Sequence, residues 1–192
     1  MRIVGIDPSY ARTGIATTTD TRSLTPPTVW ASRPPLERAT RRRAWIRSQL
    51  RAIIRSADLV AVEGMYPTTE YGAIDRAELL GAIVDLAWTT TDAAILVVAP
   101  ASPKILATGN GGPATDKPAM LTAARADGSP ARNGDEADAA WIAMLAALLT
   151  DPLHRGHDRL PAHRLRALDP YRPPWTTDHP CPWIRHPEGH RP

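Results

Sequence analysis

Two short apolar segments that each end in a carboxylate constrain this chain more than any other feature. The first is RIVGID, which ends at Asp7, and the second is DLVAVE, which ends at Glu63. Continuous apolar runs of this length are typical of strands that are covered on both faces of a sheet. An Asp before a Pro is also ordinary turn chemistry, so Asp7 by itself has a purely structural explanation. Two such carboxylates predict a functional site if the fold brings the two strand ends together.

The order of the remaining segments predicts the fold class. The first strand, a tight turn and two β-branched segments predict a three-strand meander, and later apolar runs alternate with segments of helical periodicity. We expect strands at residues 2–6, 13–19, 28–32, 58–63 and 94–100. We expect helices at residues 35–56, 69–87, 117–126 and 133–149, with Asn133 as the N-cap of the last. This order indicates an α/β fold in which a mixed sheet carries helices on both faces.

The chain divides into a domain over residues 1–150 and a tail over residues 151–192. All six histidines and nine of the twenty prolines lie after Asp151, where no helical or strand period is visible. We therefore expect the tail to be largely disordered or loosely docked. Within the domain, the Gly-rich residues 107–116 predict a flexible loop.

Cysteine content and apolar run length exclude several classes of protein. The single cysteine, Cys181, cannot form an internal disulfide, and its spacing from the nearby histidines does not fit a zinc site. No apolar run approaches the roughly 18 residues that a membrane span needs, and the N-terminus has no secretory signal pattern. We expect a soluble cytoplasmic protein with no membrane partner. The enrichment in Ala, Arg and Pro suggests the cytoplasm of a bacterium or of a phage-infected host cell.

Basic residues are concentrated in one segment. Residues 33–55 contain eight Arg and one Glu, which gives this segment a net charge of +7, against +3 for the whole chain. A basic stripe beside an acidic pocket suits a protein that holds a polyanion and cuts it with metal ions. The alternative is a solvated, Arg-rich helix face. The candidate polyanion-binding residues in this stripe are Arg41, Arg42, Arg43 and Arg47.

Two further acids complete a candidate metal site. The strands that end at Asp7 and Glu63 are separated by a helix, so the right-handed crossover rule makes them parallel neighbours. Asp135 and Asp138 are three residues apart and share one helix face, whereas Glu136 projects about 100° away from Asp135. Acids at a helix start are also favoured by the helix dipole alone. Buried acids repel one another, and four of them fit two Mg²⁺ ions, for which Mn²⁺ could substitute.

Five segments in order resemble the RuvC family of Holliday-junction resolvases, which belongs to the RNase H-like superfamily. They are GIDPSYARTG, VAVEGMY, VVAPASPK, TDKPAM after the Gly-rich loop, and GDEADAAWIA, and together they span residues 1–150. The resemblance implies an RNase H-like sheet and a homodimeric, Mg²⁺-dependent endonuclease. Such an enzyme makes paired nicks in four-way DNA junctions and leaves 5′-phosphate and 3′-hydroxyl ends. The reaction requires no side-chain nucleophile.

The resemblance also implies roles for individual residues. Asp7, Glu63, Asp135 and Asp138 match the metal-binding acids of the family. Lys104 and Lys117 match basic residues that help to hold the scissile phosphate, and Tyr66 matches an aromatic residue that stacks on an unpaired base. Ordinary surface charge for Lys117 and packing within its own loop for Tyr66 are the structural alternatives. Two departures are a slightly longer loop between the two lysines and a tail with no counterpart in the family.

Two other functions remain open. One is a protein of the same fold that binds branched DNA without cutting it, although all four acids are present. The other is an actin-like ATPase or small kinase, which needs two duplicated halves and about twice this length. The letters DEAD do not indicate a helicase, because the chain has no GxxxxGK[ST] loop.

The helix expected over residues 69–87 has apolar residues on more than one face. They are Ile74, Leu79, Leu80, Ile83, Val84 and Leu86. The resemblance implies that part of this surface meets a second subunit about a two-fold axis. The alternative is that both faces belong to the core of one chain.

Overall fold

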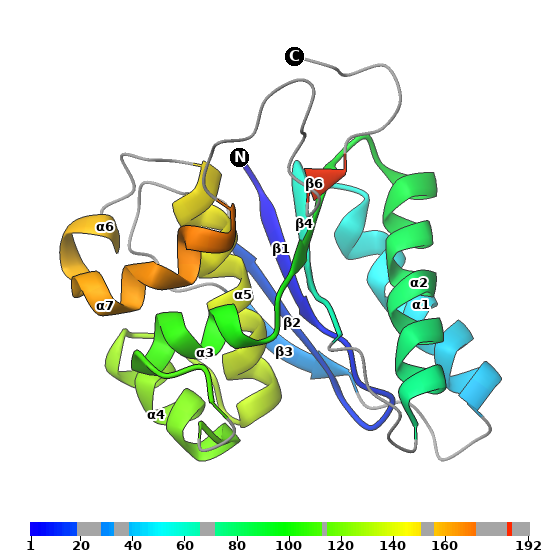
Figure 1. Ribbon diagram of the computed structural model, residues 1–192. Coiled ribbons are helices and arrows are strands. Elements are labelled where there is room, and N and C mark those ends of the chain that lie inside the picture. The colour runs from blue at the N-terminus through cyan, green and yellow to red at the C-terminus, as the bar shows by residue number, and fades with distance from the viewer. Residues whose placement is uncertain are drawn as a thin grey trace.

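A mixed sheet separates two layers of helices in the computed structural model (Figure 1). The structure describes residues 1–18, 28–32, 39–65, 72–112, 115–150, 156–171 and 184–185. The strands among them are β1 (Ile3–Asp7), β2 (Thr13–Thr18), β3 (Thr28–Ser32), β4 (Leu59–Glu63), β5 (Ala94–Val98) and β6 (Ile184–Arg185). Their order in the sheet is β3-β2-β1-β4-β5-β6. The predicted α/β class is confirmed.

Strand pairing follows the predicted topology. β1 pairs antiparallel with β2, and β2 pairs antiparallel with β3, so the three-strand meander is confirmed. β4 runs parallel to β1 and to β5, which is the crossover arrangement expected for strands separated by helices. In this register Ile6 lies opposite Val62, so the carboxyl ends of β1 and β4 are side by side. The short strand β6, antiparallel to β5, was not predicted.

Each helical layer covers one face of the sheet. The helices α1 (Ala39–Ile54) and α2 (Ala73–Thr90) lie on one side, and α3 (Ala101–Thr108), α4 (Lys117–Ala126) and α5 (Gly134–Thr150) lie on the other (Figure 1). Two separate clusters of buried apolar residues correspond to these two faces. No helix in the described ranges combines the length and the apolar character that a bilayer crossing requires.

The two-residue period of β1 decides which face each of its side chains enters. Val4 and Ile6 belong to the cluster under α1 and α2, and Ile3 belongs to the cluster under α5. Asp7 therefore lies on the α5 side of the sheet. The same period in β4 places Glu63 with Ala61 on that side. The strand ends direct both carboxylates toward the same helix.

Helix α5 approaches the sheet very closely because the facing strand residues are glycines. A Cβ added to Gly14 would lie 2.0 Å from the carbonyl oxygen of Asp135, and one added to Gly5 would lie 2.5 Å from that of Ala139. Small residues of the helix complete this contact, since Ala139 and Ala143 are fully buried against Ala16 of β2. The start of α5 is thereby held next to the end of β1 and the start of β2.

Helix α3 and the segment that follows it differ from the sequence-based expectation. No helix was predicted over Ala101–Thr108, which contains Pro103 and follows Pro100. Proline is tolerated in the first turn of a helix, where its missing N–H has no partner to lose. The described part of the expected flexible loop is tied by hydrogen bonds around Asn110, which accepts from Gly112 N at 2.9 Å and from Thr115 Oγ1 at 2.8 Å.

Part of the tail folds onto the domain, where the sequence led us to expect a segment that is largely disordered or loosely docked. Residues 156–171 form α6 (Gly156–Arg159), α7 (Ala162–Leu165) and the 3₁₀ helix η1 (Arg166–Tyr171). Leu168 and Tyr171 are buried in the same cluster as α5, and the Tyr171 hydroxyl accepts a hydrogen bond from Ala99 N at 2.7 Å. Composition suggested disorder, but a few apolar side chains suffice to dock a short helix on α3 and α5.

Candidate active site

A cavity of about 720 Å³ opens at the carboxyl ends of β1 and β4. Four acids line it: Asp7 from β1, Glu63 from β4, Asp138 from α5 and Asp116, which precedes α4. Lys104 of α3 and Lys117 of α4 line the same cavity. Five of the residues predicted from the sequence therefore share one cavity, at the edge where α/β sheets bind ligands.

Asp7 and Glu63 carry the cost of burying two adjacent carboxylates. Burial, followed by the charge of Glu63, raises the pKa of Asp7 well above its usual value. Burial, followed by the charge of Asp138, raises the pKa of Glu63 to about 7. The site therefore holds more negative charge than its protein surroundings stabilise.

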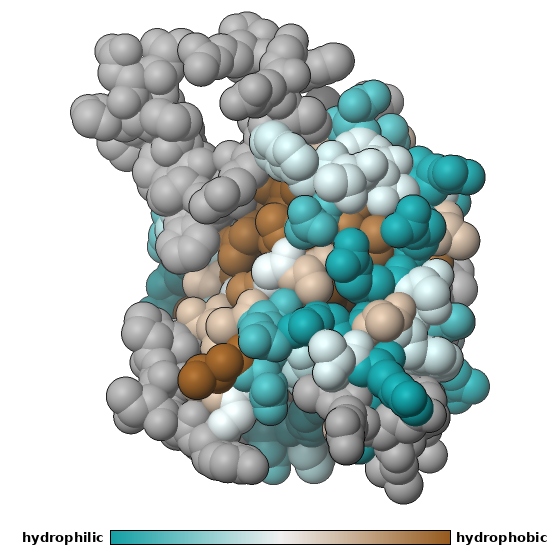
Figure 2. Space-filling model, turned by 90° about the vertical axis from the view of Figure 1, so that its right-hand side faces the viewer, coloured by the Kyte–Doolittle hydropathy of each residue, from teal (hydrophilic) through white to brown (hydrophobic). Residues whose placement is uncertain are grey.

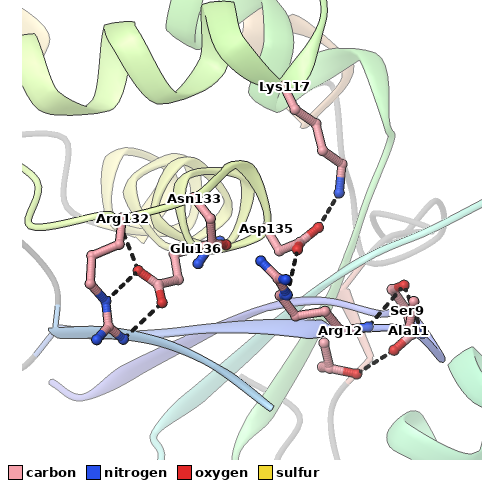
Figure 3. Close-up of polar contacts among 9 residues, drawn as sticks. Ser9, Ala11, Arg12, Lys117, Arg132, Asn133, Asp135 and Glu136 are labelled. Carbon is pink, nitrogen blue, oxygen red and sulfur yellow. Dashed lines mark hydrogen bonds and ion pairs between the residues drawn. The ribbon is translucent and has the colours of Figure 1, made fainter. Parts of the chain in front are cut away.

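Helix α5 adds the third and fourth acids. Burial and then the charge of Asp7 raise the pKa of Asp138 to about 7. Asp135, one turn earlier, is not part of the cavity wall, because cations on both sides hold its carboxylate (Figure 3). Lys117 Nζ donates to Oδ1, and Arg12 Nε lies 3.5 Å from Oδ2. The predicted i, i+3 spacing thus places both acids at the site.

The two lysines approach the acids from the helical layer that contains α5. Lys117 is the first residue of α4, whose N-cap Asp116 accepts a hydrogen bond from Ala119 N at 2.9 Å. Burial lowers the pKa of Lys117, but the hydrogen bond to Asp135 and the charge of Asp7 raise it overall. Lys117 therefore stays charged beside the cavity.

Glu136 lies away from the site, as the helical spacing predicted. It is buried, and its carboxylate accepts hydrogen bonds from Arg132 Nη2 at 2.9 Å and from Arg132 N at 2.8 Å (Figure 3). The predicted N-cap is also present, since Asn133 Oδ1 accepts from Glu136 N at 3.1 Å. These contacts fix the turn that begins α5.

The four candidate residues of the arginine stripe lie on α1, and none of them lines the cavity. Two of them pair with acids of α2: Arg43 with Glu78, and Arg47 Nη2 with Asp85 Oδ2 at 3.4 Å. Part of the excess positive charge in the sequence is therefore neutralised within the fold. The predicted stacking residue Tyr66 lies outside the described residues.

Two basic residues near the acids were missed in the sequence. Arg76 of α2 lines the cavity, and Arg12 contacts Asp135. Both lie outside the dense run of arginines in residues 33–55. Arg12 stands two residues before Gly14, but the packing of Gly14 against α5 is a tertiary contact that the sequence does not reveal.

The donor chemistry of the site fits Mg²⁺. Four carboxylates supply hard oxygen ligands, and the raised pKa values of Asp7, Glu63 and Asp138 show that a cation would relieve their repulsion. Among the described residues, however, no three such side chains already stand in ligating positions. The pairing of Asp135 with Lys117 and Arg12 accounts for part of this, because each oxygen of that carboxylate already contacts a cation.

Comparison with known proteins supports the fold. No protein-family model matches this sequence, and no curated protein matches it either. Among solved structures, RuvC from Thermus thermophilus superposes with a TM-score of 0.60 at 22% identity over 78% of this chain and 96% of that one. The same protein in complex with a Holliday junction substrate gives 0.60 at 19% identity, over 78% and 95%. The chain therefore has the RNase H-like fold of Thermus thermophilus RuvC.

Proposed function

We propose that this protein is a Mg²⁺-dependent endonuclease that cuts Holliday junctions or related branched DNA. The observation that carries the proposal is the meeting of Asp7, Glu63 and Asp138 with two lysines in one cavity, with Asp135 beside it. The RuvC structure of the same fold in complex with a Holliday junction supports the substrate class. The products would carry 5′-phosphate and 3′-hydroxyl ends.

The charge of each side chain in the site suggests its role, either metal binding or phosphate binding. The four acids would hold two Mg²⁺ ions, with Mn²⁺ as a substitute, and the bound metal would supply an activated water and stabilise the leaving oxygen. Lys104 and Lys117 stand on the cavity wall formed by α3 and α4, where they would bind the oxygens of the scissile phosphate. Together with the bound metal, these cations would offset the charge of the acids and so let a polyanion enter the cavity.

We propose that two copies pair through α2. The buried residues of α2 are Leu79, Ile83, Leu86 and Ala87. Two large apolar residues of the helix are exposed, Ile74 at 76% and Trp88 at 41%. Figure 2, which views the side of α1 and α2, shows apolar surface among polar residues. A two-fold axis through this face would place two active sites on one junction.

The decisive experiment measures binding and cutting separately. Asp7→Asn keeps the shape of the side chain but removes a metal-binding charge. We expect it to lower the rate of nicking of a synthetic four-way junction in Mg²⁺ by at least about a thousandfold. Junction binding measured by gel shift in Ca²⁺ should be unchanged. Linear duplex of the same sequence is the substrate control, and Glu136→Gln is the control for loss of an acid near the site.

The alternative function, binding of branched DNA without cutting, predicts a different result in the same assay. A branched-DNA-binding protein with an inactive metal site would bind the junction tightly and cut nothing in Mg²⁺ or Mn²⁺. The presence of acids at all four positions argues against it. Wild-type protein that binds junctions without nicking them would replace our proposal with this alternative.

A further inference from the structure

The Asp135 carboxylate is occupied by a different cation at each oxygen. Lys117 Nζ donates to Oδ1, and Arg12 Nε lies 3.5 Å from Oδ2 (Figure 3). The Asp135 side chain is only 13% exposed, so water does not screen these contacts strongly. A metal ion that uses Asp135 as a ligand needs at least one of the two oxygens. One cation must therefore leave, and the structure distinguishes them.

Arg12 is held in place by the backbone around it. The turn that carries it is closed by Ser9, whose Oγ accepts from Arg12 N at 3.4 Å and whose carbonyl accepts from Thr13 Oγ1 at 2.8 Å. Two residues later, Gly14 packs directly against the carbonyl of Asp135. The Arg12 side chain is 28% exposed and does not line the cavity. Arg12 therefore lies behind Asp135, away from the space where substrate would bind.

Lys117 is placed so that its charged end can move. Its side chain is 59% exposed and lines the cavity. The stem crosses the first residue of α5, where a Cβ added to Gly134 would lie 2.6 Å from Lys117 Cβ. The missing side chain of Gly134 thus makes room for the stem, and the exposed side chain carries its ammonium to Asp135 beside the cavity. An ammonium on four flexible methylenes changes partner more readily than a planar guanidinium.

We propose that Arg12 is a positioning residue that keeps Oδ2 of Asp135, while Lys117 is an exchangeable occupant of Oδ1. When metal binds, Lys117 gives up Oδ1 to the ion and becomes available to a phosphate in the cavity. Metal loading and phosphate binding are thereby coupled through one lysine. This inference rests on the proposed function, and it gives a role to a residue, Arg12, that the resemblance left unassigned.

The test is direct metal binding by the full chain without DNA, measured by calorimetry with Mg²⁺ and with Mn²⁺. Lys117→Met removes a competitor and should tighten binding by about twofold to fivefold. Arg12→Ala lets the Asp135 carboxylate rotate and should weaken binding by about tenfold. Arg12→Lys should fall between Arg12→Ala and wild type. In an Asp135→Asn background, both the gain and the loss should disappear.

The opposite directions of the two effects make the inference falsifiable. If Arg12→Ala and Lys117→Met shift the affinity in the same direction, the two cations are equivalent and the inference is overturned. Should Arg12→Ala fail to fold, as judged by circular dichroism in EDTA, Arg12→Lys must still bind metal more weakly than wild type. Wild-type protein that binds metal and nicks junctions while these shifts fail overturns only this inference. Wild-type protein that does neither overturns the proposed function as well.

Discussion

At the scale of single residues, the site is defined by carboxylates that the fold stabilises poorly. Asp7, Glu63 and Asp138 all have raised pKa values, with burial as the main cause in each case. Glu136, which follows Asp135 in the chain, is also buried. Its pKa is nevertheless lowered, in contrast to the raised pKa values of those three acids. Burial raises the pKa of Glu136, but the bonds from Arg132 outweigh burial and lower it. Buried acids that lack such partners indicate a binding role, and a paired one indicates a structural role.

Asp138 predicts an unusual pH dependence for the metal-free protein. Its pKa is about 7 in the folded state and ordinary in the unfolded state, so the folded protein binds the extra proton between about pH 4 and 7. The free energy of unfolding is therefore highest below this window and declines as the pH rises through it. Asp138→Asn should raise the free energy of unfolding by about 2 kcal/mol at pH 8 in EDTA, and should have little effect near pH 4. Urea titrations at both pH values measure this.

The matched control for this prediction is Glu136→Gln. The Glu136 pKa is lowered overall by Arg132, so its carboxylate stabilises the fold above its unfolded pKa and loses this effect as the pH falls. Glu136→Gln should therefore lower stability at pH 8, opposite to Asp138→Asn. A loss of stability in both variants at pH 8 would contradict the charge argument for Asp138.

At the scale of secondary-structure elements, the packing of α5 on β1 and β2 decides where the helical acids lie. Gly5 and Gly14 let the helix backbone approach the strands, and the alanines of α5 present no bulk at the contact. Spacing along α5 puts Asp135 and Asp138 on one face, but only this approach brings that face to Asp7. A strand with larger residues here would form the same sheet and would hold the acids apart.

Gly14→Ala tests the close approach. The new Cβ would meet the Asp135 carbonyl at 2.0 Å, so strand or helix must shift. We expect a loss of about 1–3 kcal/mol in the free energy of unfolding and a larger fractional loss of Mg²⁺ affinity. Gly81→Ala is the control, because a Cβ there meets nothing within 4 Å and should be neutral or slightly stabilising. Unchanged metal affinity in Gly14→Ala would mean that the approach does not position the acids.

Helix α1 carries the arginine stripe, and its first turns lie nearer the active-site edge of the sheet than its last turns do (Figure 1). Arg43 and Arg47 form ion pairs with acids of α2. The contribution of the stripe to DNA binding therefore stays a prediction. Replacing Arg41 and Arg42 with Ala should weaken junction binding and reduce the slope of log K against log salt by about 1–2. Replacing Arg51 and Arg55, at the other end of the helix, serves as the control. Equal slopes in the two double variants would assign the stripe to solvated surface.

At the scale of the whole molecule, two surfaces extend the fold beyond the site. The helices of residues 156–171 cover α3, which carries Lys104, so part of the tail stabilises the wall of the cavity. On the far side of the sheet, the outer face of α2 leaves apolar residues in contact with solvent. The first surface is already covered within one chain. The second is the surface through which we propose that two copies pair.

Ile74→Glu tests the pairing of two copies. Ile74 is 76% exposed, so a charge costs the single chain little, but it would be buried in the proposed interface. We expect sedimentation at micromolar concentration to show a dimer for wild type and a monomer for the variant. Paired nicking of a junction should become single nicking. Ala52→Glu on the exposed side of α1 is the control, and a wild-type protein that sediments only as a monomer would contradict the dimer.

Local pattern alone determined much of this protein. Apolar runs that end in Asp7 and Glu63, the helical spacing of Asp135 and Asp138, and the Asn133 cap are set by neighbours along the chain, so they are visible in the sequence. Chain connectivity then fixed the parallel pairing of β1 and β4.

Only the tertiary structure decided which cations meet which acids. Arg12 and Lys117 are more than 100 residues apart, yet they contact the two oxygens of one carboxylate. Nothing local distinguishes Arg12 from the arginines of α1, two of which pair with α2 instead. The docking of residues 156–171 was hidden for the same reason, because a few apolar residues acquire a partner only once α3 and α5 are in place.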